Sequence, residues 1–474
     1  MVEKEVKMKI FEKNKGFKVI NGNSLEVLDA LEPNSIDAII TDPPYELGFM
    51  NKKWDNSGIA YNIELWKKAL RVLKSGGYLL AFGGTRTYHR IACAIEDAGF
   101  EIRDCIMWLY GSGFPKSLNI GLAIDKKLGC SDRGHRIAVA NRNHPNGTLE
   151  PNGDKLPKYE GRIEEGKKWE GWGTALKPAY EPIIVARKPV EGSVADNVLK
   201  YQVGGININE CRVGEVGGVK KVEIEPDSGS KNCGFGCNGK LEQLDLGRFP
   251  ANVILTYDET DEKEVIGGMP NTEGSKGKPF SATDYEEHET ATNFTRGDFN
   301  PYNDEGSAAR YFYCAKASKK DRDAGLIEFE EKDAKTLINR EEDSAGASWN
   351  GKYSSGNAFA GAGAIKKNIH PTVKPVELMQ YLVKLVTPKG GVVLDIFNGS
   401  GSTGKAVAFE NRERDANYKY IGIELDPEYC RISEYRIDYA LNKYQYDIIE
   451  EIKENEKKGQ LSIFDFTYED EEGE

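Results

Sequence analysis

Apolar and polar positions follow one another along the first 110 residues in a pattern that predicts alternating strands and helices. Apolar residues spaced three or four positions apart predict an amphipathic helix at 65–73, ended by Gly76 and Gly77, and a second helix at 89–98. Short apolar runs predict strands at 18–20, 38–40, 78–82 and 102–110. Strands that alternate with helices are typical of a parallel sheet.

Two polar stretches interrupt this pattern. The first, 113–173, is rich in Gly and precedes a strand predicted at 179–188. The second runs from about 190 to about 364 and is crowded with Gly, Asn, Ser and charged residues, with strand-like islands at 249–255 and 310–316. We therefore expect either one large α/β domain with a substantial insertion or two domains in this chain of 474 residues.

The turn Asp42-Pro43-Pro44-Tyr45 follows the predicted strand 38–40 and offers groups that suit a flat ring with an amine. Asp42 and the Pro43 carbonyl can each accept one amine hydrogen. Two successive prolines restrict the backbone, so the turn keeps its shape without a ligand, and Tyr45 offers a ring for stacking. The structural alternative is an ordinary turn at a strand end, where Pro and Asp are common.

A second turn, rich in Gly, lies near the other end of the chain. It joins a buried strand predicted at 392–395 to the start of a helix, and a strand at 420–424 follows that ends in Glu424. The spacing from Gly399 to Gly404 also fits a dinucleotide-binding fingerprint. That fold needs a second half, however, and only about fifty residues follow Glu424, so a classical NAD domain is not expected.

Together these turns resemble the DNA amino-methyltransferases that use S-adenosylmethionine. The resemblance rests on the turn at 42–45, on Asp395-x-Phe397-x-Gly399-Ser400-Gly401-Ser402, and on His370-Pro371-Thr372-Val373-Lys374-Pro375, which precedes a helix predicted at 376–386. It implies a Rossmann-like α/β fold, with a mostly parallel seven-stranded sheet and helices on both faces. The order of the motifs is similar to the beta class of that family, whose members modify N6 of adenine or N4 of cytosine.

The motif order implies four parts. Residues 1–189 would form the catalytic half of the methyltransferase domain and 365–445 its cofactor-binding half. Residues 190–364 would form an irregular inserted target-recognition region, for which a structural insertion without sequence reading is the alternative. Residues 446–474 are a charged tail.

The resemblance also assigns roles to single residues. Asp42 and Pro43 would orient the amine, and Tyr45 would stack on the base. The implied cofactor-binding residues are Asn23, Asp42, His370, Thr372, Lys374, Asp395, Phe397, Gly399, Ser400, Gly401, Ser402 and Glu424. Glu424 would accept hydrogen bonds from the ribose hydroxyls, a role that its place at a strand end suits independently.

Two positions depart from the family. It often has Gly-Asp where this chain has Gly22-Asn23, which bears on the contact with the cofactor's adenine, and it often has Thr where Ser402 stands. Asp42 rather than Ser favours adenine over cytosine in the family. Methylation of a cytosine ring carbon is disfavoured, because that reaction needs a cysteine nucleophile and the chain has no Pro-Cys pair.

The formal net charge of −12 is unusual for a protein that binds nucleic acid. Six carboxylates between Asp465 and Glu474 account for half of it. Cations and aromatic residues alternate from Arg310 to Lys316 and are followed by Lys319, Lys320 and Arg322. This cluster is either a half-buried strand with a solvated loop or a DNA contact, and both can hold together.

Cysteine spacing bears on metal binding, and hydropathy bears on membrane insertion and secretion. The chain has 8 cysteines but no C-x-x-C pair, so reduced, unliganded cysteines and no metal are expected. A zinc site of Cys233 and Cys237 with Cys211 or His288 is the alternative. We expect no membrane span and no signal peptide, hence a cytoplasmic, nucleoid-associated protein.

The tail segment Gln460-Leu461-Ser462-Ile463-Phe464-Asp465-Phe466 is similar to the peptide by which bacterial replication proteins bind the sliding clamp. Its apolar side chains would enter a groove on the clamp. The alternative is that they pack on the chain's own catalytic domain.

The functional hypothesis is therefore methyl transfer from S-adenosylmethionine to N6 of adenine in duplex DNA, after the base is flipped. The alternatives are an N4-cytosine DNA methyltransferase, an RNA or protein-glutamine methyltransferase, and a catalytically silent DNA-binding protein.

Overall fold

The computed structural model describes residues 9–14, 16–47, 53–110, 117–129, 163–214, 219–222, 240–243, 247–257, 269, 271–272, 306–316, 319–330, 332–333, 365–443 and 446. The chain divides into two compact units. The first consists of Met1–Leu109, Glu181–Ile327 and Thr372–Glu474, and the second of Tyr110–Tyr180 and Glu328–Pro371.

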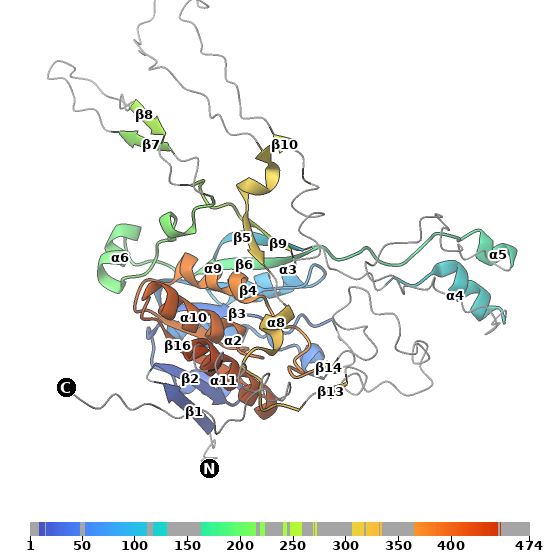
Figure 1. Cartoon of the computed structure of the whole chain (residues 1–474), viewed down its shortest axis with the longest axis horizontal. Coiled ribbons are helices and arrows are strands. Elements are labelled where there is room, and N and C mark those ends of the chain that lie inside the picture. The colour runs from blue at the N-terminus through green and yellow to red at the C-terminus, as the bar shows by residue number, and fades with distance from the viewer. Residues whose placement is uncertain are drawn as a thin grey trace, which may run out of the picture. The chain divides into compact units, whose positions relative to one another are not determined.

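A ten-stranded sheet forms the centre of the first unit (Figure 1). Its strand order is β1-β2-β16-β15-β3-β4-β6-β5-β9-β12. The strands are β1 Lys9–Asn14, β2 Phe17–Asn21, β3 Ile36–Thr41, β4 Leu73–Phe82, β5 Glu101–Tyr110, β6 Tyr180–Arg187, β9 Val253–Tyr257, β12 Tyr313–Lys316, β15 Val392–Asp395 and β16 Lys419–Glu424. From β2 to β4, each neighbouring pair runs parallel. β1 is antiparallel to β2 and β6 is antiparallel to β4. The mostly parallel α/β sheet confirms the predicted fold class.

This sheet contains the seven expected strands and three more. β1 extends one edge, and β9 and β12 extend the other as a parallel pair. β9 and β12 come from the span 190–364 that was predicted to be an irregular insertion, yet Ile254, Leu255 and Ala315 are buried. Burial of these apolar side chains explains why part of that span joins the sheet. The predicted domain boundaries themselves stay a prediction.

Helices cover both faces of the sheet. They are α1 Ser24–Ala30, α2 Ile63–Val72, α3 Tyr88–Asp97, α6 Val194–Tyr201, α8 Lys319–Asp323, α9 Val376–Val386, α10 Ser402–Arg414 and α11 Pro427–Leu441. α2 packs against α1 and α3, and α10 packs against α9 and α11. All six residues of β3 are buried, as expected for a parallel strand between two helix layers.

The junction between α2 and β4 differs from the prediction. The helix ends at Val72 and the strand begins at Leu73, so Gly76 and Gly77 lie inside the strand. The pairing of β3 with β4 shifts register in this region, and Gly76 adopts a φ of 79°. A β-carbon on Gly76 would collide with the side chain of Asn197, which donates to Ser75 O at 2.8 Å. The glycines therefore permit a bulge and a close approach rather than ending the helix.

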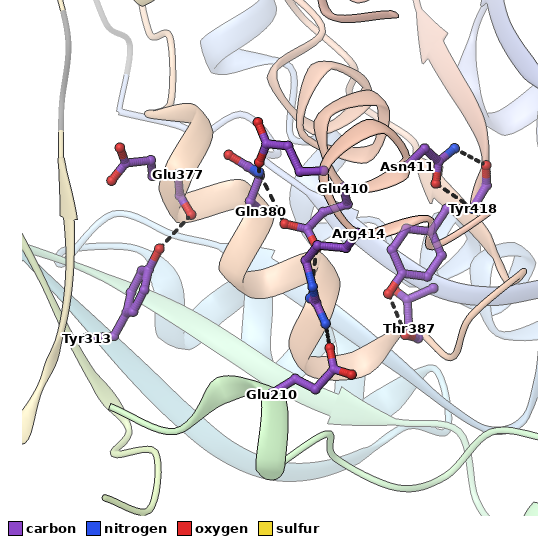
Figure 2. A network of polar contacts seen from close by, with 10 residues as sticks. Glu210, Tyr313, Glu377, Gln380, Thr387, Glu410, Asn411, Arg414 and Tyr418 are labelled. Carbon is purple, nitrogen blue, oxygen red and sulfur yellow. Dashed lines mark hydrogen bonds and ion pairs between the residues drawn. The ribbon is translucent and has the colours of Figure 1, made fainter. Parts of the chain in front are cut away.

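Polar contacts hold α9 against α10 and the loop before β16 (Figure 2). Gln380 Nε2 donates to Glu410 Oε1 at 3.1 Å, and Arg414 Nη1 donates to Glu410 Oε2 at 2.9 Å. Arg414 also forms an ion pair with Glu210. Tyr418 Oη donates to Thr387 O at 3.1 Å. These contacts hold together α9, α10 and the loop before β16, which follow residues 190–364 in the sequence.

The remaining described elements are small. In the first unit, β7 Val219–Val222 pairs with β8 Lys240–Gln243, and β10 Asn271–Thr272 pairs with β11 Gly306–Ser307. The second unit contains α4 Ile120–Lys127, α5 Glu164–Lys167 and the antiparallel pair of β13 Lys332–Asp333 with β14 Ile365–Lys366. Trp169 and Trp172 form an edge-to-face pair there, with ring centroids 5.3 Å apart.

Several predictions fall outside the described residues. Cys233, Cys237, His288 and the segment Gln460 to Phe466 are among them, so the zinc alternative and the clamp peptide stay predictions. Within the described ranges, no cluster of three metal-ligating side chains occurs. Those ranges also hold no helix with the length and apolar character of a membrane span.

Trp66 on α2 tests this arrangement of the core. Its side chain is fully buried and its indole nitrogen donates to Ala60 O at 2.9 Å. Trp66→Ala should lower the free energy of unfolding by about 3–5 kcal/mol, because it leaves a large cavity. Trp172→Ala is the control, since that side chain is 60% exposed, and should cost less than about 1 kcal/mol. Chemical denaturation of both variants measures the difference, and equal effects would contradict the described core.

Candidate active site

The two predicted turns lie at one edge of the sheet. β3 leads into Asp42, β15 ends at Asp395, and β16 ends at Glu424. Because these three strands are parallel neighbours, their carboxyl ends meet at the same edge. Ligands of open α/β sheets bind at this edge. The fold therefore brings together motifs that are about 350 residues apart in the sequence.

A hydrogen bond joins the two turns directly. Thr41 Oγ1, the last side chain of β3, donates to Asp395 Oδ1 at 2.7 Å. The amide of Phe397 donates to Thr41 Oγ1 and to Asp395 Oδ1, both at 3.1 Å. Thr403 Oγ1 donates to Asp395 Oδ2 at 2.6 Å. Burial raises the pKa of Asp395 to about 6, although these hydrogen bonds favour its ionised form.

Glu424 also supports the Gly-rich turn. Its carboxylate accepts from the amide of Gly399 at 2.7 Å and from the amide of Asp426 at 2.9 Å. Burial raises the pKa of Glu424 to about 7, against the effect of these two hydrogen bonds. The side chain remains partly exposed, so its carboxylate can still meet a ligand.

Arg436 holds the same turn from the side of α11. Its Nη1 donates to Ser400 O at 2.7 Å, to Ser400 Oγ at 3.0 Å and to Ser402 Oγ at 3.2 Å. Lys405, in the first turns of α10, pairs with Asp321 Oδ1 at 2.5 Å. Burial and the charge of Arg436 lower the pKa of Lys405 to about 8. The turn is thus fixed in place by side chains from α8 and α11.

Asp42 has one oxygen that is engaged and one that is not. Its Oδ2 pairs with the ammonium of Lys374 at 2.5 Å. Its Oδ1 is buried and has no hydrogen-bond partner among the described residues. A buried acceptor without a partner costs free energy, so this atom is suited to receive a donor from a ligand.

Lys374 and Tyr45 converge on a second acid, Glu181. Tyr45 Oη donates to Glu181 Oε2 at 2.6 Å, and the Lys374 ammonium lies 3.6 Å from the same oxygen. Burial, followed by the charges of Asp42 and Glu181, raises the pKa of Tyr45 well above its usual value, so its hydroxyl stays neutral. Burial alone would lower the pKa of Lys374, but the two carboxylates outweigh it and raise the pKa.

The other predicted residues have these positions. Asn23 is exposed in the turn between β2 and α1, where its side chain accepts from the amide of Leu25 at 3.0 Å. Thr372 is exposed, whereas Lys374 is buried on Asp42. His370 belongs to the second unit, where its amide donates to Asn368 Oδ1 at 3.0 Å. Their roles toward a cofactor stay predictions.

Four residues at this edge were not singled out from the sequence. They are Thr41, Glu181, Arg436 and Asn398. Asn398 Nδ2 donates to Ser433 Oγ at 2.8 Å, and Tyr420 Oη donates to Asn398 Oδ1 at 2.6 Å. The available signal for Glu181 was an acid directly before the apolar run 182–186 of β6. Arg436 is distinguished only by its burial, which a sequence does not display.

The cluster of cations and aromatic residues is partly explained by packing. Tyr313 on β12 stacks on Tyr381 of α9, with ring centroids 4.1 Å apart. Burial lowers the pKa of Arg322, which follows on α8. The half-buried strand is thus present, and a DNA contact by this cluster stays a prediction.

A cavity of about 280 Å³ lined by Thr387, Arg414 and Tyr418 lies beside the starts of β15 and β16, away from the sheet edge that carries the two turns.

The family model described as DNA methylase matches residues 36–204 and 236–435. Type II methyltransferase M.HindIII of Haemophilus influenzae is 26% identical over 235 residues, which cover 40% of this chain and 65% of that protein. Type II methyltransferase M.HpaI of Haemophilus parainfluenzae is 35% identical over 106 residues, or 21% of this chain and 34% of the relative. DNA adenine methyltransferase YhdJ of Escherichia coli is 34% identical over 93 residues, which cover 20% of this chain and 29% of that protein. The chain thus spans less than two thirds of the length of each of these relatives.

Solved structures of similar proteins include M1.HpyAVI, with 13% identity, a TM-score of 0.34 and coverage of 89% of this chain and 98% of that one. The cytosine-N4-specific PvuII DNA methyltransferase has 13% identity and a TM-score of 0.34, with 90% and 93% covered. The family match spans most of the chain and includes the 42–45 turn and the Gly-rich turn, which confirms the predicted resemblance and S-adenosylmethionine as cofactor. The chain belongs to the DNA methylase family of N6/N4 amino-methyltransferases.

Proposed function

We propose that the protein is a site-specific DNA methyltransferase that modifies N6 of adenine in duplex DNA. One observation carries this proposal: Asp42 Oδ1 is buried without a hydrogen-bond partner among the described residues, on a turn joined to the Gly-rich turn through Thr41 and Asp395. An unused acceptor beside a methyl-donor site is what an amine substrate requires.

The amine needs acceptors because its lone pair is delocalised into the base. Asp42 Oδ1 would accept one amine hydrogen and the Pro43 carbonyl the other, which draws the nitrogen toward tetrahedral geometry. Tyr45 would stack on the ring, a contact worth roughly 1–3 kcal/mol. Asp42 Oδ1 is also the atom placed to take the proton that the amine loses. The fixed turn needs no rearrangement for any of these roles.

The Gly-rich turn fits the cofactor. Gly401 is the N-cap of the 13-residue helix α10 and no side chain caps that helix, so its first amides can favour a carboxylate such as that of the methionine end. Asp395, Phe397, Gly399, Ser400 and Ser402 would frame that end. Glu424 would accept from the ribose hydroxyls, while Asn23, His370 and Thr372 complete the proposed set. Bound S-adenosylmethionine would supply an electrophilic methyl group.

Duplex DNA requires that the target base leave the helix before Asp42 can reach its amine. Base flipping costs a few kcal/mol, which stacking and contacts to the base edge offset. Asp42 favours adenine, and the similarity to a relative named DNA adenine methyltransferase supports that choice. N4 of cytosine presents the same amine chemistry and is the second candidate.

The wider assignments follow from this function. Residues 190–364 would read the target, 1–189 and 365–445 would form the methyltransferase domain, and 446–474 the tail. The protein would act in the cytoplasm on nucleoid DNA. The segment Gln460 to Phe466 would bind the bacterial sliding clamp.

Gly401 tests the cofactor site. It has a φ of 75°, and a β-carbon there would lie 2.9 Å from Ser433 Cα. Gly401→Ala should weaken cofactor binding about tenfold or more, since strain at such positions is on the order of 1–3 kcal/mol. Gly390→Ala is a matched control, because Gly390 has a φ of 76° but open space around it. Calorimetric titration with S-adenosylmethionine measures both, and wild-type affinity for Gly401→Ala would contradict the site.

The pKa of Glu424 predicts a pH dependence for cofactor binding. Since burial raises this pKa to about 7, the carboxylate is ionised above pH 7 and loses its charge as the pH falls through 7. The Kd for the cofactor should rise about tenfold between pH 8 and pH 6. Glu424→Gln should flatten the profile, whereas the exposed Glu428→Gln should not. A wild-type Kd that is independent of pH would count against Glu424 as a ligand.

Asp42→Ala tests the function. Purified protein is incubated with labelled S-adenosylmethionine and unmethylated duplex DNA, RNA or protein. The wild type should label DNA as N6-methyladenine, and Asp42→Ala should lose at least about 100-fold in rate while it still binds the cofactor. Label in RNA or protein alone would overturn the proposal, and N4-methylcytosine would favour the second candidate.

A further inference from the structure

The ammonium of Lys374 lies between two carboxylates that come from different strands. Asp42 follows β3, and Glu181 lies on β6. The nitrogen is 2.5 Å from Asp42 Oδ2 and 3.6 Å from Glu181 Oε2. The side chain of Lys374 is only 7% exposed, so water screens this ion pair little.

Aromatic rings form the rest of the surroundings. The Lys374 ammonium lies 5.4 Å from the ring centroid of Tyr45, 5.1 Å from that of Phe82 and 6.0 Å from that of Trp108. Ring faces attract a cation at these distances. The cation is therefore held on several sides, and its position determines which oxygen of Asp42 is engaged.

We propose, on the basis of the proposed function, that Lys374 and Glu181 are positioning residues of the amine site. Lys374 holds Asp42 through Oδ2, which leaves Oδ1 for the target amine. Glu181 holds the Lys374 ammonium and the Tyr45 hydroxyl, so the acceptor and the stacking ring are set by one shared acid. Neither residue needs to touch the cofactor for this role.

Glu181 links groups that would otherwise move separately. Tyr45 Oη donates to it at 2.6 Å, which fixes the plane of the ring on which the base would stack. A ring with a fixed orientation loses less entropy when a base binds. Glu181 should thus affect DNA binding through Tyr45 and catalysis through Lys374.

Charge balance gives Lys374 a second effect. The titratable groups around Asp42 are Lys374, Glu181, Tyr45 and, at the end of β15, Asp395. Without the ammonium, the partly exposed carboxylates of Asp42 and Glu181 would lie near the buried Asp395 with no cation, which favours protonation of one of the three. A protonated Asp42 would lose part of its capacity to accept the amine hydrogen and its proton.

Lys374→Met removes the cation with little change in length. Its kcat at pH 7 should fall roughly 100-fold, and the acidic limb of its kcat profile should move up by about one pH unit or more. Its Kd for S-adenosylmethionine should stay within about twofold of the wild type, because the ammonium is engaged by acids at the amine turn. Lys374→Arg keeps the charge and should keep the acidic limb in place. The exposed Lys389→Met is the matched control and should behave as the wild type.

Glu181→Gln completes the test. Alone, it should raise the KM for DNA and leave the acidic limb in place. In the Lys374→Met background, Glu181→Gln removes one of the carboxylates that the ammonium no longer balances. The acidic limb of the kcat profile should therefore return toward lower pH, and part of kcat should be restored. A purely structural role for Lys374 would give no such recovery.

The outcomes separate this inference from the proposed function. A wild-type protein that binds the cofactor but methylates no DNA would refute the function itself. An active wild type, with a Lys374→Met variant whose acidic limb is unchanged and whose cofactor affinity is lost, would refute the positioning role and assign Lys374 to the cofactor. Additive losses in the double variant would also refute it. Circular dichroism checks that each variant is folded, and Lys374→Arg keeps the test decisive where Lys374→Met does not fold.

Discussion

The hydrogen bond from Thr41 to Asp395 is the contact on which the proposed site depends. It connects the last residue of β3 to the last residue of β15, two neighbouring parallel strands. Thr41 also accepts from the amide of Phe397, so one hydroxyl fixes both the amine turn and the start of the Gly-rich turn. Because Thr41 and Asp395 are buried, loss of either partner would leave a polar atom unsatisfied. The distance between an acceptor at Asp42 and a methyl donor would thus be set by the sheet.

Buried charge is the second constraint on this edge. Burial raises the pKa of both Asp395 and Glu424, and their hydrogen bonds to backbone amides and hydroxyls offset only part of this cost. Asp42 and Glu181 instead share the Lys374 ammonium. Asp395 and Glu424 are therefore stabilised by neutral donors, whereas Asp42 and Glu181 are stabilised by a cation.

The sequence predicts the central fold because its strands are short apolar runs that alternate with helices, which is typical of a parallel sheet. The two turns are predictable for different reasons: consecutive prolines at 43–44 leave few backbone conformations, and glycines at 399 and 401 permit the positive φ that the second turn requires. The junction at Leu73 was not predictable, since the glycines after it serve a bulge that Asn197 supports from elsewhere in the chain. β9 and β12 were missed as part of the sheet because their apolar runs are brief and their flanks are polar.

Side-chain partners across long separations are the part that patterns do not contain. Glu181 lies 136 residues from Tyr45, and Lys374 lies 332 residues from Asp42. Only the order of the strands brings them together, and no local spacing encodes that order. Lys374 was assigned to the cofactor because its neighbours in the sequence belong to a cofactor segment, yet its ammonium contacts the amine turn. The position of Lys374 in a motif indicated the region in which it lies. The direction of its side chain could be known only from the fold.

The most direct test is the position of the target amine in a crystal structure of the protein with duplex DNA and S-adenosylhomocysteine. Asp42 Oδ1 is expected to lie within about 3 Å of the exocyclic nitrogen of a flipped adenine, with Lys374 still on Oδ2 and the ring of Tyr45 on the base. A flipped base whose amine points away from Asp42, or a base bound with Lys374 between its amine and Oδ1, would contradict the account.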